Sequence, residues 1–133
     1  MATLDAPTRA FLAEKRFAVL ATINASGSIQ QTVMWYDLEG DEILMNTLVG
    51  RVKDGNLRRN PHVSICIEDG YRFVTLSGTV CLIEDQPTAQ ADIRRLALRY
   101  AKDPATIDAD AEHFTHETRV TLRMTLEKIM TRF

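Results

Sequence analysis

Residues 51–61 read Arg-Val-Lys-Asp-Gly-Asn-Leu-Arg-Arg-Asn-Pro and lie between two apolar, strand-like runs at residues 42–47 and 62–68. Asn60 and Pro61 end this segment, because a residue that precedes proline is pushed out of the helical region of backbone space. The segment therefore predicts one short helix between two strands.

The start of this predicted helix carries two basic residues, Arg51 and Lys53. Cations there are unfavourable to the helix dipole. The free N–H groups and the positive end of the dipole invite an anion, most obviously a phosphate. Asn56 lies one turn from Lys53 and can share its face, while Leu57 packs inward. The alternative interpretation is a basic helix face that is simply solvated.

The rest of the chain predicts a mainly β (α+β) fold. Gly78, in the middle of the long fifth strand, indicates a bulge or a close backbone approach. Helices are expected at residues 7–16, 88–101 and 105–117. Strands are expected at residues 17–23, 28–38, 42–47, 62–68, 73–84 and 119–131. Six strands joined by short turns or single helices are typical of an antiparallel barrel.

Length and composition predict a single domain, residues 1–133, with 45% hydrophobic residues and a net charge of −2. This charge makes nucleic acid an unexpected partner. No apolar run approaches the roughly 18 residues of a membrane span, and the N-terminus has no signal-peptide core. Cys66 and Cys81 lie in apolar runs, so we expect reduced, buried thiols in a cytoplasmic protein.

The sequence gives little support to a catalytic dyad or a metal centre. It contains no G-x-S-x-G, Walker A or G-x-G-x-x-G motif, which argues against a Rossmann fold. His113 and His116 have helical spacing and acidic neighbours, but no further set of ligands accompanies them. We therefore expect no catalytic side chain and no metal.

A family resemblance rests on the helix motif. A strand followed by Gly50-Arg51-x-Lys53, then Asn56-Leu57-x-x-Asn60-Pro61 and another strand, resembles the flavin- and deazaflavin-binding split β-barrel superfamily, which includes pyridoxamine 5′-phosphate oxidase. The R-x-K-x-x-N-L-R-R-[DN]-P form is most similar to the actinobacterial-type branch that uses coenzyme F420. The resemblance covers residues 8–84 well and residues 85–133 by general layout.

This resemblance implies a six-stranded antiparallel split barrel with peripheral helices, of the FMN-binding type. It also implies a homodimer with two cofactor sites at the subunit interface. In such a fold the protein positions a redox cofactor, and the cofactor performs the hydride chemistry. Carried over from the motif, Arg51 and Lys53 bind the cofactor phosphate with help from Asn56, Thr47 and Leu48 lie against the ring system, and Gln31, Thr32 and Val33 lie beside it.

Two departures from the family pattern refine the expected activity. Gly50-Arg51-Val52-Lys53 replaces the Ser-Arg-Lys of many tight FMN binders and so favours F420. The C-terminal residues lack the Arg-x-x-x-R-x-x-P type of ending that would indicate true pyridoxamine phosphate oxidase. We expect an F420-dependent oxidoreductase that acts on a small unsaturated or conjugated substrate. The alternatives are an FMN-dependent oxidase or reductase and a non-catalytic cofactor carrier. Trp35 and Tyr36 are either core aromatics or part of the substrate pocket.

Overall fold

The computed structural model describes residues 1–133, apart from the side chain of Asp110. Its helices are α1 (Ala6–Ala13), α2 (Val52–Arg59), α3 (Gln86–Tyr100) and α4 (Ile107–Asp110), with 3₁₀ turns at Pro104–Thr106 and Glu112–His116. Its strands are β1 (Ala18–Ile23), β2 (Ile29–Met34), β3 (Asp37–Glu39), β4 (Glu42–Leu48), β5 (His62–Asp69), β6 (Arg72–Ile83) and β7 (Arg119–Arg132). The fold is mainly β, as predicted.

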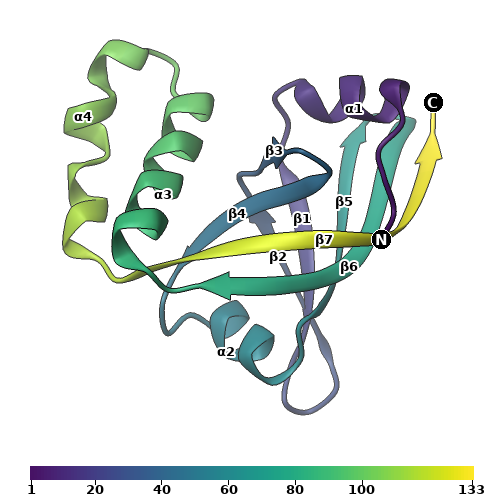
Figure 1. The fold of residues 1–133 in the computed structure, drawn as a ribbon, viewed down its shortest axis with the longest axis horizontal. Helices are drawn as coiled ribbons and strands as arrows, with labels where there is room; N and C mark the ends of the chain where they lie inside the picture. The colour runs from purple at the N-terminus through teal and green to yellow at the C-terminus, as the bar shows by residue number, and fades with distance from the viewer.

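The strands form one curled antiparallel sheet in the order β2-β1-β5-β6-β7-β4-β3. Helix α1 lies at one end of the sheet and α2 at the opposite end, while α3 and α4 lie to one side (Figure 1). The clean alternation of β7 points its apolar side chains into the core, as predicted: Val120, Leu122, Met124 and Leu126 are fully buried. The sheet is thus a split barrel with its core inside the curl.

The sequence predicted one strand over residues 28–38, and this prediction was wrong. The chain forms two strands, β2 and β3, so the sheet has seven strands rather than six. The backbone N–H of Tyr36 donates to the Tyr100 hydroxyl at 3.3 Å, and the Tyr100 hydroxyl donates to the Tyr36 carbonyl at 3.3 Å. A side chain of α3 thus replaces a strand neighbour here. Tyr36 itself is fully buried, and its hydroxyl donates to the carbonyl of Leu12 at 2.8 Å.

Gly78 shows both features that its position predicted. The register between β6 and β7 shifts between Ser77 and Gly78, which marks a bulge. A Cβ atom on Gly78 would lie 1.9 Å from the carbonyl oxygen of Thr125, so no side chain fits there.

The prediction that both cysteines are buried was wrong. Both are free thiols, but Cys66 is half-buried and Cys81 is exposed. Strand alternation explains the error: Ile65, Ile67 and Val80 point into the barrel, so their cysteine neighbours point outward. An apolar run around a residue does not decide which face that residue occupies.

The structure contains helices close to the predicted ranges 7–16 and 88–101, but not one helix over 105–117. Ile93, Leu96 and Ala97 of α3 are buried against the sheet, as their spacing predicted. Residues 105–117 form three short pieces rather than one helix. No helix of the described chain is long and apolar enough to cross a membrane.

Candidate functional site

The loop between β4 and α2 forms the start of the site. Gly50 has a positive φ of 94°, which lets the chain turn sharply after the strand. Its N–H donates to the carboxylate of Asp54 at 2.8 Å, which closes the first turn of the helix. Arg51 is the N-cap residue, and α2 ends at Arg59, directly before Asn60 and Pro61, as predicted.

Lys53 lies in this first turn and is 7% exposed. Among the described side chains, no hydrogen bond or ion pair neutralises its ammonium group. Burial lowers the pKa of Lys53, and the nearby charges of Arg51 and Arg119 lower it further. Leu57 packs inward, as predicted, at 3% exposure. Lys53 is therefore a buried cation without a counterion, a state that proteins normally avoid.

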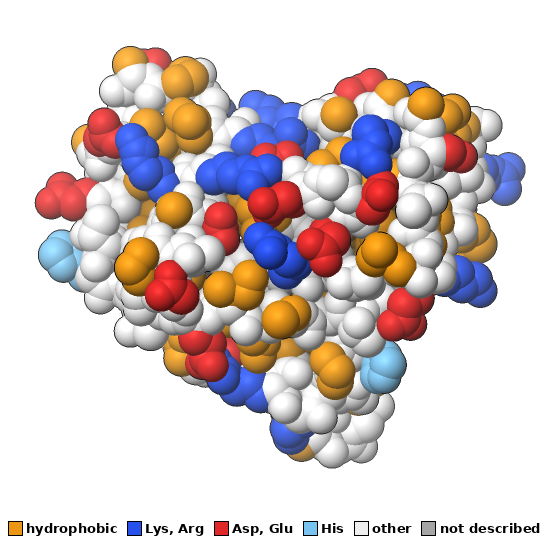
Figure 2. Space-filling model, viewed as in Figure 1, with side chains coloured by type: hydrophobic (Ala, Val, Ile, Leu, Met, Phe, Trp, Pro, Cys, Tyr) orange, Lys and Arg blue, Asp and Glu red, His pale blue; other side chains and the backbone are white. Residues whose placement is uncertain are grey.

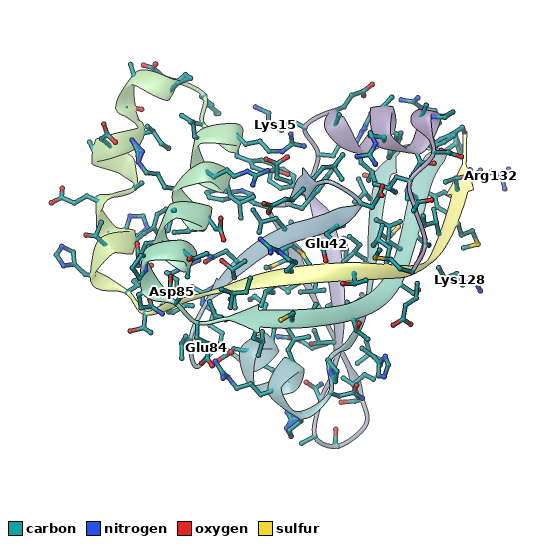
Figure 3. The ribbon with its side chains drawn as sticks, in the orientation of Figure 1. Lys15, Glu42, Glu84, Asp85, Lys128 and Arg132 are labelled. Carbon is teal, nitrogen blue, oxygen red and sulfur yellow. The ribbon has the colours of Figure 1, made fainter. Side chains whose placement is uncertain are left out.

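Asp54 is the obvious candidate to neutralise Lys53, but it serves a different cation. Its Oδ1 accepts a hydrogen bond from Nε of Arg58 at 2.9 Å, and Arg58 also pairs with Glu84 at 2.9 Å. Figure 3 shows Glu84 at the end of β6, beside α2. The positive charge at the start of the helix thus remains uncompensated.

Asn56 is engaged within the protein. Its Nδ2 donates to Oγ1 of Thr22 at 3.0 Å and to Oδ1 of Asn24 at 2.9 Å, and its Oδ1 accepts from Arg59 at 2.6 Å. It is 1% exposed. The Asn56 amide therefore links α2 to β1. The role in phosphate binding that the resemblance assigned to Asn56 remains a prediction.

The remaining predicted residues fall into two groups. Thr47 and Leu48 are the last residues of β4 and directly precede the loop that carries Gly50 and Arg51. Thr47 is buried and Leu48 is half-buried. Gln31 and Val33 are exposed on the outer face of β2, and Thr32 is half-buried. In the described part of the chain, no hydrogen bond or ion pair joins β2 to Arg51 or Lys53. The fold therefore brings the β4–α2 group together and leaves the β2 group apart.

Sequence reasoning missed Arg119 and Asn46. Both are buried polar residues, at 7% and 5% exposure. Arg119 lies opposite Leu48 in the β4–β7 register, and its Nε donates to Oδ1 of Asn46 at 3.0 Å. In the sequence Arg119 is only the first residue of an alternating strand. Only the strand register, which the sequence did not give, could have placed it beside α2.

Arg51, Lys53 and Arg119 together create an electropositive region at the first turn of an α-helix. The first N–H groups of any helix lack acceptors within the helix and carry its positive dipole end. A phosphate would satisfy these donors and neutralise the cations. The residues therefore fit the phosphate of a flavin-type cofactor. The described side chains include no cluster of three or more potential metal ligands.

A curled, split antiparallel barrel with a cluster of cations at the start of α2 is typical of the flavin-binding split-barrel class. The family model described as pyridoxamine 5′-phosphate oxidase matches residues 4–133, and the chain belongs to this family. The resemblance inferred from the α2 motif is thereby confirmed. Among curated protein sequences, none matches this chain significantly.

Solved structures show the same fold. A structure named F420 reductase is 23% identical and has a TM-score of 0.77, covering 96% of this chain and 98% of its own. A conserved hypothetical protein from Mycobacterium tuberculosis is 26% identical with a TM-score of 0.78, covering 98% and 85%. The heme storage protein HutZ from Vibrio cholerae is 18% identical with a TM-score of 0.71, covering 98% and 95%. Proteins named for different functions thus share this fold.

Proposed function

We propose that this protein is an F420-dependent oxidoreductase that acts on a small unsaturated or conjugated substrate. The observation that carries the proposal is the buried, unneutralised ammonium group of Lys53 beside Arg51 at the start of α2. When bound, the deazaflavin supplies the hydride chemistry. The protein's own residues hold its phosphate, with Arg51 and Lys53 as the cations and Thr47 and Leu48 against the ring system.

Two observations favour F420 over other cofactors. The turn has the Gly50-Arg51-Val52-Lys53 form, and a structure named F420 reductase shares the fold over nearly the whole chain. FMN is the alternative, since the same cations suit its phosphate. The likeness to the heme storage protein HutZ keeps the non-catalytic carrier as a second candidate.

A side-by-side binding titration with F420 and FMN tests this proposal. We expect colourless purified protein that quenches added F420 and binds it more tightly than FMN. Yellow protein with bound flavin would identify the FMN-dependent alternative. Tight F420 binding without turnover across a broad panel of conjugated acceptors would favour the carrier.

We further propose that the protein acts as a homodimer with its cofactor site at the subunit interface. The outer face of β2 carries two exposed apolar side chains, Ile29 at 60% and Val33 at 64%, and Phe17, directly before β1, is 56% exposed. Val33 and Gln31 share this face. A second copy covering it would bury the apolar side chains and bring β2 into the composite site. An interface of this obligate kind buries more than roughly 2,000 Å².

Light scattering tests the dimer directly. We expect a dimer at micromolar concentration for the wild type and a monomer for Val33→Glu, which places a charge in the interface. The monomeric variant should also bind F420 weakly although Lys53 is intact. A wild-type monomer would contradict the proposal. A cytoplasmic location, which would keep both thiols reduced, forms part of the same proposal.

A further inference from the structure

Arg119 is a buried arginine whose side chain the proposed function has not yet used. It is the first residue of β7 and lies opposite Leu48, the last residue of β4. The backbone N–H of Arg119 donates to Oε1 of Gln86 at 3.0 Å, and its carbonyl accepts from Nε2 of Gln86 at 2.9 Å. The start of the strand, and with it the base of the side chain, is therefore fixed.

The guanidinium group is held on two of its three nitrogens. Nε donates to Oδ1 of Asn46 at 3.0 Å, and Nη1 donates to Oε1 of Glu117 at 3.1 Å. The ring of Phe114 lies 5.2 Å from the guanidinium carbon. Asn46 is itself fixed, because its Nδ2 donates to the carbonyl of Ala89 at 2.9 Å. Nη2 has no partner among the described residues, so one donor edge is oriented and unused.

Arg119 also shares its electrostatic environment with the cations of α2. Burial lowers the pKa of Lys53, and the charges of Arg51 and Arg119 lower it further. Burial also lowers the pKa of Arg119, with Glu117 acting in the opposite direction and Arg51 in the same one. Glu117 is the one carboxylate paired with Arg119. Glu117 thus neutralises Arg119, whereas the described residues offer no ion pair to Arg51 or to the buried Lys53, and an unpaired buried cation is costly without an anion.

Arg95 and Arg123, in another part of the molecule, each pair with two carboxylates. Figure 2 shows basic and acidic side chains intermingled over the notch beside α3. There, Arg95 pairs with Asp37 at 3.1 Å and Glu39 at 3.5 Å, and Arg123 pairs with Glu39 at 3.3 Å and Glu42 at 3.8 Å. The excess of positive charge at the start of α2 is thus a local property of this site.

We infer that Arg119 is a third anion-binding residue, which acts with Arg51 and Lys53 on a ligand that presents two negative charges at this site. This inference rests on the proposed function, because it concerns the same site. A phosphomonoester dianion such as that of FMN has this chemistry. A phosphodiester followed by a carboxylate, as in the tail of F420, has it as well. In either case the Nη2 edge of Arg119 would donate to the second anionic oxygen.

The test compares Arg119→Gln with Arg123→Gln. Arg123 lies on the same strand and the same face, but acidic side chains neutralise it. Affinities are measured by fluorescence titration with F420, FMN and riboflavin, which lacks the phosphate. We expect Arg119→Gln to weaken the binding of F420 or FMN by about tenfold, the effect of one charge-assisted hydrogen bond. Riboflavin affinity should not change, and Arg123→Gln should match the wild type within about twofold.

The salt dependence of the affinity loss distinguishes a lost electrostatic interaction from a change in the structure of the site. The tenfold loss should shrink as the salt concentration rises, because screening weakens the electrostatic term that the variant lacks. A loss that is equal at all salt concentrations, or equal for riboflavin and FMN, would overturn the inference. If Arg119→Gln fails to fold, Arg119→Lys decides: it keeps the charge but lacks the Nη2 edge, so we expect weaker binding of F420 and FMN with unchanged riboflavin affinity, and unchanged affinity for all three ligands contradicts the inference.

The outcome also distinguishes this inference from the proposed function. If Lys53→Ala weakens binding and Arg119→Gln does not, the α2 site stands and the role of Arg119 fails. If neither variant changes the affinity for F420 or FMN, the proposed cofactor site itself fails. Comparing F420 with FMN then shows which of the two anionic ligands gains more from Arg119.

Discussion

Replacing Lys53 should weaken cofactor binding and stabilise the unliganded protein at the same time. Among the described residues, Lys53 makes no hydrogen bond or ion pair that would compete with a ligand for its charge. Its whole charge-assisted interaction is therefore available to the ligand. Such an interaction contributes about 1.5 to 3 kcal/mol. Since each 1.4 kcal/mol is tenfold in affinity, Lys53→Ala should bind F420 or FMN roughly ten- to a hundredfold more weakly.

The expected effect on stability has the opposite sign. The folded protein buries the Lys53 ammonium beside Arg51 and Arg119, and this unfavourable environment lowers its pKa. Lys53→Met removes the charge and keeps most of the side-chain volume. The melting temperature of the unliganded protein should therefore rise. A variant that merely damaged the fold would lose both affinity and stability.

Fluorescence titration against both cofactors and thermal melting without ligand measure the two effects. Arg58→Ala is the matched control, because Arg58 lies on the same helix but already pairs with Asp54 and Glu84. It should change affinity much less than Lys53→Ala. Equal affinities for the wild type, Arg51→Ala and Lys53→Ala would refute the anion site and leave α2 as a basic helix with no ligand.

Three further predictions concern pH and stability. The pKa of Lys53 is lowered from its ordinary value of 10.5; between the lowered pKa and 10.5 the unfolded chain therefore binds more protons, and stability should rise with pH across that window. Melting curves of the wild type should show this rise, and those of Lys53→Met should show less of it. Gly78→Ala should destabilise the fold by about 1 to 3 kcal/mol in chemical denaturation, because its Cβ would overlap the carbonyl oxygen of Thr125; a neutral change would contradict the close approach. Asn56→Ala should cost about 1 to 3 kcal/mol in the same measurement, because it removes the hydrogen bonds of a buried amide to Thr22 and Asn24, and an unchanged denaturation midpoint would count against this linkage.

Local patterns in the sequence predicted the elements that local chemistry determines. The Asn60-Pro61 pair set the end of α2, and the alternation in residues 119–131 gave the inward face of β7. Gly78 marked its bulge because only a glycine tolerates that approach. In the first two cases the residues that decide the structure are neighbours along the chain, and in the third a single glycine marks the position where a distant strand comes close.

Features that depend on distant partners could not be predicted. The break between β2 and β3 depends on Tyr100, 64 residues away from Tyr36. Arg119 joins the site only because β7 pairs with β4 in a particular register. Cys81 was assigned to the core because its neighbours are apolar, yet the register of β6 turns it outward. The sequence motif therefore predicted helix α2 with Arg51 and Lys53. It did not predict Arg119, whose position depends on how the strands of the sheet pair.

The break at Trp35 and Tyr36 limits how the barrel can open. Strands β2 and β3 are the two edges of the sheet, yet they are consecutive in the chain. Consecutive Cα atoms are about 3.8 Å apart, so two intervening residues tether Met34 and Asp37 within about 11 Å of each other. This covalent tether of two residues therefore bounds the separation of the two sheet edges at this end.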